Sequence, residues 1–167
     1  MVKRVFGVLA SVALFLLTAG RTQADGNSQF GTNDLAVIAN KGSSVVSLSS
    51  RDLRSIFLGT KDTWPDGTKL IAVSLPTARP ETRAVLKEIC GMSEQDFTRY
   101  FLMMNFQGKS VSPPRMMRTA ASIKAFVEST RGALGVIPIR DVDSSVNVMS
   151  IDGARPGAPG YKLAMGR

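Results

Sequence analysis

The sequence LAVIA at residues 35–39 decides the fold class, because its five consecutive apolar residues make a run of strand length without alternation. Such a run is typical of a strand that is buried on both faces of its sheet. Similar runs recur at residues 70–73 and 133–137, and residues 146–151 can form a last strand. We therefore expect a central sheet that is covered on both faces.

Between these strands, apolar residues recur at helical spacing. The expected helices carry Leu53, Ile56 and Phe57 before Gly59; Val85, Leu86 and Ile89 between Pro80 and Gly91; Phe97, Tyr100, Phe101 and Met104 after a Ser93 cap; and Ile123, Phe126 and Val127. Residues 107–118 break regular structure, because they contain one glycine and two prolines. Strands alternating with helices predict an α/β domain with a mostly parallel sheet flanked by helices.

The first 24 residues have the features of a cleavable signal peptide. Lys3 and Arg4 precede an uncharged stretch that ends before Arg21, and Thr22-Gln23-Ala24 supplies small residues for cleavage. The uncharged stretch is shorter than the ~20 residues that a membrane span needs. We expect a periplasmic protein without a stable membrane anchor. The expected segments are a signal peptide (1–24), a flexible lead-in (25–33), an α/β domain (34–151) and a C-terminal tail (152–167).

The composition excludes several kinds of chemistry. The 167 residues include no His and one Cys, so His-dependent catalysis, His-ligated metals and an internal disulfide are impossible. The chain has a formal net charge of +8, of which three positive charges belong to the expected signal peptide. Export argues against nucleic acid, so an anionic solute or an acidic envelope surface is the expected partner. We expect no enzyme activity, no cofactor and no metal, and we expect Cys90 to be a buried, inert thiol.

Two loops are candidates for binding an anion, because each is expected to follow a strand and to enter a helix N-terminus. The loop at residues 42–50 offers the hydroxyls of Ser43 and Ser44, although helix capping explains such serines equally well. The loop at residues 74–83 offers hydroxyls and two guanidinium groups, although a solvated helix start would also explain the arginines. Its candidate ligand-binding residues are Ser74, Thr77, Arg79, Thr82 and Arg83.

Five segments together resemble the phosphate ABC transporter substrate-binding proteins, which have the type II periplasmic binding fold. They are LAVIAN at 35–40, LRSIFLG at 53–59 followed by Lys61, WPDG at 64–67, IAV at 71–73 and GALGV at 132–136. The resemblance spans residues 34–138 and implies a single lobe of that fold. It also implies a non-catalytic, PstS-like protein that binds phosphate or a similar oxyanion and works with an ABC transporter permease or a membrane sensor.

The chain departs from this family at the expected ligand loop. Family members are two-lobed, are more than twice as long and carry an Arg-x-Asp-Gly-Ser-Gly-Thr loop after the strand that corresponds to residues 71–73. In direct register, Pro76 replaces the Arg, Ala78 replaces the Asp, and only Thr82 matches. Arg79 can substitute for the Arg, and Glu81 can either supply the missing acceptor or repel a dianion.

Two other interpretations remain open from the sequence. The chain can be a protein–protein module that keeps the scaffold without the ligand site and serves a membrane sensor or transport complex. Alternatively, two copies can face each other and complete the cleft that a single lobe leaves open.

Overall fold

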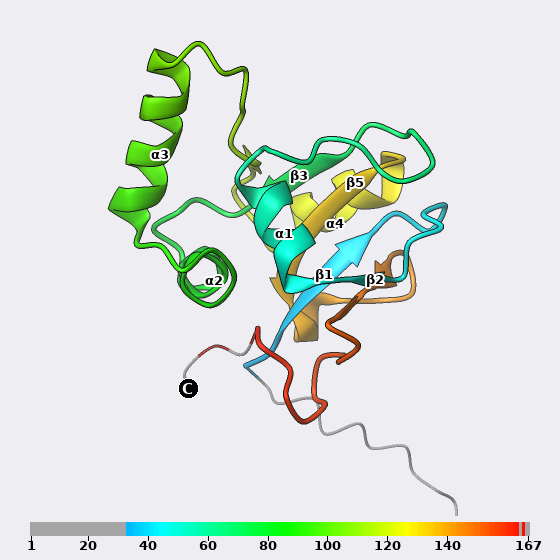
Figure 1. Cartoon of the computed structure of the whole chain (residues 1–167). Helices are drawn as coiled ribbons and strands as arrows, with labels where there is room; N and C mark the ends of the chain where they lie inside the picture. The colour runs from blue at the N-terminus through cyan, green and yellow to red at the C-terminus, as the bar shows by residue number, and fades with distance from the viewer. Residues whose placement is uncertain (1–32, 164, 166–167) are drawn as a thin grey trace, which may run out of the picture.

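The computed structural model describes residues 33–163 and 165, so the expected signal peptide and almost all of the expected lead-in lie outside it. The centre of the fold is a five-stranded sheet with the order β4-β3-β5-β1-β6. Figure 1 shows β3, β5 and β1 of this sheet side by side. These strands are β1 (Leu35–Ala39), β3 (Ile71–Ser74), β4 (Arg115–Met116), β5 (Ala133–Pro138) and β6 (Asn147–Val148). A second, two-stranded parallel sheet joins β2 (Ser47–Leu48) to β7 (Ser150–Ile151). The expected last strand is thus divided between two sheets.

The main sheet is mixed rather than mostly parallel. β3 pairs in parallel with β4 and β5, whereas β1 pairs antiparallel with β5 and β6. The α/β class is confirmed, but the direction of β1 differs from the expectation. Both β1 and β5 are buried along their whole length, and a continuous apolar run carries no information about strand direction.

Helices cover both faces of the sheet. They are α1 (Ser50–Phe57), α2 (Pro80–Val85), α3 (Glu94–Phe106) and α4 (Ala120–Ser129), together with a π-helical turn η1 (Leu86–Cys90) that continues α2 and a short 3-10 turn η2 (Ile139–Asp141). One face packs against α4 through Ile123 and Val127. The other face packs against α1, α2 and η1, with Phe57 and Leu86 among its buried residues, and α3 adds Phe97 and Phe101 to the same cluster. Because α2 and α4 lie on opposite faces of the sheet, the loops that lead to them run toward opposite faces.

Residues 152–163 do not form a tail, because two of their apolar side chains belong to the core. Tyr161 and Leu163 are buried, and the Tyr161 hydroxyl donates to the Leu35 carbonyl at 2.6 Å. The Leu35 N–H in turn donates to the Leu163 carbonyl at 2.7 Å. Isolated apolar residues among Gly and Pro give no periodicity, so the sequence did not indicate this packing.

Gly132 is expected to be intolerant of a side chain. Its φ is +83°, and a Cβ there would collide with the Lys69 carbonyl oxygen. We expect Gly132→Ala to lower the free energy of unfolding by about 2–3 kcal/mol, from backbone strain and steric overlap together. Gly67 is the matched control, because its φ is +82° and no atom would contact its Cβ. Equal losses for the two alanine variants in urea unfolding would contradict the steric part of this account.

Candidate functional site

The carboxyl ends of β3 and β4 form a switch point at one edge of the main sheet. β3 leads to α2 on one face of the sheet, whereas β4 leads to α4 on the other face. The two strands are parallel neighbours, and the Met117 N–H donates to the Ser74 carbonyl at 2.8 Å. A switch point of this kind is where open α/β sheets generally bind ligands.

The first residues of the 42–50 loop, including Ser43 and Ser44, lie at the opposite end of the sheet from the 74–83 loop. β1 runs antiparallel to β5, and β5 runs parallel to β3, so the segment after Ala39 lies far from the end of β3. Ser43 is engaged locally, because its hydroxyl contacts the N–H and the carbonyl of Val45 at 3.3 Å each. Ser44 is exposed in the same loop. Ser43 and Ser44 therefore do not join the residues of the 74–83 loop in one site.

The helix that follows the 42–50 loop is capped by the protein's own groups. Ser49 accepts from the Asp52 N–H, and the Asp152 carboxylate accepts from the N–H and hydroxyl of Ser50 at 2.9 and 2.5 Å. Lys162 donates to the same carboxylate at 2.7 Å. The N-terminus of α1 is thus capped by side chains of the protein itself, as the helix-capping interpretation of these serines predicts.

Asp152 should make the stability depend on acid pH. Hydrogen bonds from Lys162 and Ser50 lower the pKa of Asp152 to about 2. A lowered folded pKa adds stability above the unfolded value near 4, and this stability is lost as the pH falls toward 2. The carboxylate is 39% exposed, so we expect Asp152→Asn to cost about 1 kcal/mol or less near neutral pH. In urea unfolding the gap between wild type and variant should close below about pH 2; a gap that persists there would contradict this assignment.

Two of the candidate hydroxyls in the 74–83 loop are already used as donors. The Thr82 hydroxyl donates to the Leu75 carbonyl at 2.9 Å, and the Thr77 hydroxyl donates to Glu94 Oε1 at 2.6 Å. These bonds hold the loop to β3 and to the first turn of α3. The Ser74 side chain is buried, and its hydroxyl makes no hydrogen bond with any residue that the structure describes. Of these three hydroxyl groups, the one of Ser74 is therefore free to donate a hydrogen bond to a ligand.

The start of α2 has backbone donors without acceptors. Arg79 occupies the N-cap position but makes no side-chain cap hydrogen bond, and Pro80 has no N–H. The first backbone bond runs from the Arg83 N–H to the Arg79 carbonyl at 3.0 Å. Within residues 33–163 and 165, the N–H groups of Glu81 and Thr82 have no acceptor. Buried N–H groups normally have partners, so these two are available to a ligand.

The Glu81 side chain is buried with one oxygen unsatisfied. Its Oε1 is 3.5 Å from Arg79 Nη2, while its Oε2 has no hydrogen-bond partner among the described residues. The side chain of Glu81 is 6% exposed, compared with 56% for Arg79. Burying a carboxylate oxygen without a hydrogen bond costs free energy. The unsatisfied Oε2 therefore indicates that a donor, such as water or a protonated ligand, belongs next to it.

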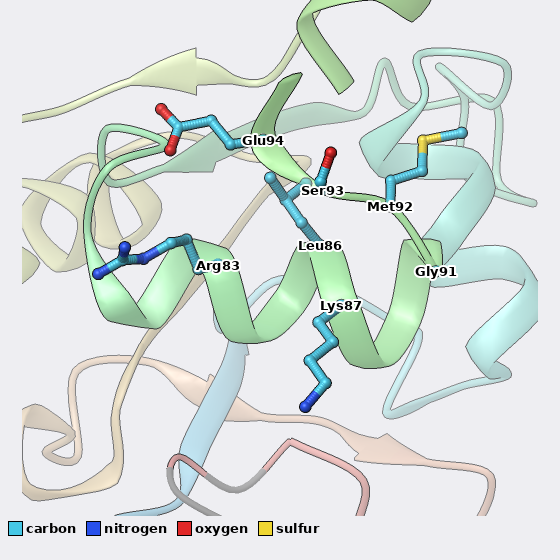
Figure 2. Close-up of a pocket in the computed structure, with 7 residues that line it drawn as sticks. All are labelled: Arg83, Leu86, Lys87, Gly91, Met92, Ser93 and Glu94. Carbon is cyan, nitrogen blue, oxygen red and sulfur yellow. The ribbon is translucent and has the colours of Figure 1, made fainter. Parts of the chain in front are cut away.

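A pocket of about 560 Å³ lies beside this loop, between the helix formed by α2 and η1 and the start of α3 (Figure 2). Its lining residues are Arg83, Leu86, Lys87, Gly91, Met92, Ser93 and Glu94. Figure 2 shows Arg83 and Glu94 on the same side of the pocket, whereas Lys87 points away. Arg83 is exposed and makes no ion pair with the part of the chain that the structure describes. Its guanidinium group is therefore free to pair with an anion at the loop.

Cys90 is buried at the end of η1, as the sequence predicts. Burial raises the pKa of its thiol to about 11, and the nearby positive charge of Arg54 opposes this effect only in part. A thiol with such a pKa is protonated at neutral pH and is a poor nucleophile. Cys90 is therefore a packing residue.

The structure also places residues at this edge that the sequence did not single out. The loop after β4 brings Arg118 and Thr119 to the sheet edge where Ser74 ends its strand. β4 has only two residues, so no alternating pattern could reveal it. Among residues 33–163 and 165, no three His, Cys, Asp or Glu side chains are placed to hold a metal ion, and no helix has the length and hydropathy of a bilayer span.

No protein-family model and no curated protein matches the chain. Solved structures do match. A putative phosphate ABC transporter substrate-binding protein with bound phosphate from Clostridium perfringens has a TM-score of 0.63 at 19% identity, over 78% of this chain and 51% of its own. PstS from Borrelia burgdorferi has a TM-score of 0.59 at 10% identity, over 74% of this chain and 49% of its own. An ABC-type phosphate transport receptor from Vibrio cholerae has a TM-score of 0.52 at 22% identity, over 74% of this chain and 48% of its own.

The fold is that of half a phosphate-binding protein. The chain spans about half the length of these solved structures, which agrees with the single lobe that the sequence predicts. At these identities the likeness concerns the fold alone.

Proposed function

We propose that the protein binds phosphate or a similar oxyanion at the 74–83 loop without catalysing a reaction. The observation that carries this proposal is the uncapped start of α2, where the N–H groups of Glu81 and Thr82 have no acceptor among the described residues. The helix continues through η1 to Cys90, so its dipole adds to these donors. The phosphate bound by the structurally similar Clostridium perfringens protein supports the choice of ligand class.

The positive charge of this site comes from two arginines that flank the helix start. Arg79 and Arg83 are both exposed, so each guanidinium group can turn toward an anion above Glu81 and Thr82. Guanidinium groups bind tetrahedral oxyanions through paired N–H donors. The Ser74 hydroxyl can add a neutral donor from the end of β3. Thr77 and Thr82 position the loop, because their protons are already donated within the protein.

Glu81 gives the site a basis for selecting a protonated oxyanion. Its unsatisfied Oε2 can accept a hydrogen bond from the P–OH group of hydrogen phosphate, whereas sulfate carries no proton at neutral pH. A sulfate ion would leave Glu81 unpaired and facing a like charge. We propose that Glu81 does the work of the carboxylate that is absent at Ala78.

The cellular role that fits this binding activity is in the envelope. We propose that the protein is exported to the periplasm and delivers or reports its oxyanion to an ABC transporter permease or a membrane sensor. The likeness of the fold to half of solved phosphate-binding proteins supports a solute-binding role.

Thermal unfolding of the purified protein with added oxyanions tests the proposed function. A ligand that binds only the folded state at 100 times its dissociation constant stabilises by about 2.7 kcal/mol, so phosphate should raise the Tm by several degrees. Arsenate, which is also protonated, should act like phosphate, and sulfate should have a smaller effect. Glu81→Gln should reduce the difference between phosphate and sulfate, because an amide can also donate. Unchanged unfolding curves in all three anions would refute the proposal.

A further inference from the structure

α3 exposes an apolar face that does not belong to the core. Its buried residues, Phe97 and Phe101, lie on the side that packs against the rest of the domain. On the opposite side, Leu102 is 54% exposed, Met103 is 52% exposed and Phe106 is 90% exposed. Figure 1 shows α3 at the outer edge of the molecule. Three large apolar side chains that are exposed together on one helix face indicate an interaction surface.

The same helix has a hollow about two turns before Phe106. This hollow has a volume of about 780 Å³ and is lined by Ser93, Glu94, Gln95, Thr98, Arg99 and Leu102. Arg99 and Phe106 are seven residues apart, which is about 10 Å along the helix axis, and they lie on the same face. A projecting aromatic ring and a hollow on one helix face make that face self-complementary when two copies run antiparallel.

We propose that α3 pairs with α3 of a second copy of this chain, antiparallel and around a two-fold axis between Leu102 and Met103. In this register Leu102 and Met103 of the two copies meet at the centre. Phe106 of each copy enters the hollow of the other and lies against Arg99, where ring and guanidinium group can stack. The inference is independent of the oxyanion site.

The charges at the two ends of the helix fit the antiparallel direction. The first turn of α3 carries Glu94 and Asp96, the last turn has no basic residue, and Lys109 follows just beyond the helix. Antiparallel pairing brings the acidic first turn of one copy level with Lys109 of the other. A parallel pair would instead place the acidic turns side by side, which is unfavourable.

The size of this face predicts a weak dimer. α3 has 13 residues, and a pair of helices about 20 Å long buries less than the ~1,200 Å² of a stable interface. Sedimentation velocity on the purified protein should show a monomer that becomes a dimer between about 10 and 500 µM, the range of weak association. Phe106→Glu should remain monomeric with an unchanged Tm, because Phe106 is almost fully exposed.

Cysteine cross-linking tests the register. Leu102→Cys should form an intermolecular disulfide on mild oxidation, because the two copies of residue 102 lie next to the proposed axis. Gln95→Cys is the matched control on the same face, since its two copies are about 22 Å apart along the axis. Cys90 is buried and does not interfere.

Three results would overturn the proposal. The first is a monomer throughout the concentration range, and the second is equal cross-linking at positions 95 and 102. The third is a monomer that binds phosphatidylcholine vesicles through Phe106, which would assign this face to a lipid surface.

Discussion

Replacing Tyr161 with alanine should lower the free energy of unfolding by about 3–5 kcal/mol, the cost of removing a large aromatic side chain from a packed core. Tyr161 is 2% exposed, and its hydroxyl donates to the Leu35 carbonyl at 2.6 Å at the start of the buried strand β1. A loss of this size is a large part of the stability of a domain of this length. Urea unfolding monitored by circular dichroism measures it.

Tyr161→Phe separates the hydrogen bond from the packing. It keeps the ring but leaves the Leu35 carbonyl without this donor, so we expect a loss of about 1–2 kcal/mol. If Tyr161→Ala were as stable as wild type, residues 152–163 would be a tail after all, as their composition suggests.

Removing both arginines at the start of α2 should weaken phosphate binding by about 100-fold or more, because hydrogen bonds to charged groups contribute about 1.5–3 kcal/mol each. Arg79→Ala alone has a second effect, since it also leaves the Glu81 carboxylate without its cationic neighbour at 3.5 Å. Arg83 has no ion pair with a described residue, so Arg83→Ala should affect ligand binding alone. Isothermal titration of phosphate into each variant measures the effect.

Arg51→Ala is the matched control for charge. Arg51 is an exposed arginine in the first turn of α1, a separate helix whose start is already capped by Ser49 and bonded to the Asp152 carboxylate. Its removal lowers the net charge by the same amount as each of the other single changes, so general electrostatic attraction is affected equally. If Arg51→Ala and Arg83→Ala weakened phosphate binding equally, the anion would bind at another place or would respond only to the net charge, without a defined site.

The sequence predicted the starts and ends of helices well where neighbouring residues determine them. Pro80 begins α2, Gly91 ends η1 with a φ of +63°, and Ser93 caps α3 by accepting from the Asp96 N–H. Each of these features depends on residues within one or two turns of each other. The buried strands also follow from their composition, because an uninterrupted apolar run has no exposed face.

The antiparallel direction of β1 could not be predicted in this way. It depends on which strands become neighbours, and apolar runs such as β1 and β5 fit either direction. For the same reason the sequence placed the 42–50 and 74–83 loops at apparently equivalent strand ends, whereas the structure places Ser43 and Ser44 at the opposite end of the sheet from the end of β3.

The candidate site was predicted only in outline. Residue type identified Ser74, Arg79 and Arg83 as possible ligands of an anion, but it could not show that Thr77 and Thr82 donate their protons within the protein. Nor could it show that Glu81 is buried with an unsatisfied oxygen, because a charged residue in the first turn of a helix is usually exposed. These features arise from contacts between segments that are distant in sequence, such as the bond from Thr77 to Glu94.

The central claim is that backbone donors at the start of α2 hold the anion, and amide chemical shifts test it most directly. In a titration of the isotope-labelled protein with phosphate, the N–H signals of Glu81 and Thr82 should move downfield and saturate together, as free amides do when they gain an anionic acceptor. If both signals stay in place up to about 10 mM phosphate, or if the shifts concentrate at residues 42–50, the site proposed for this loop is wrong.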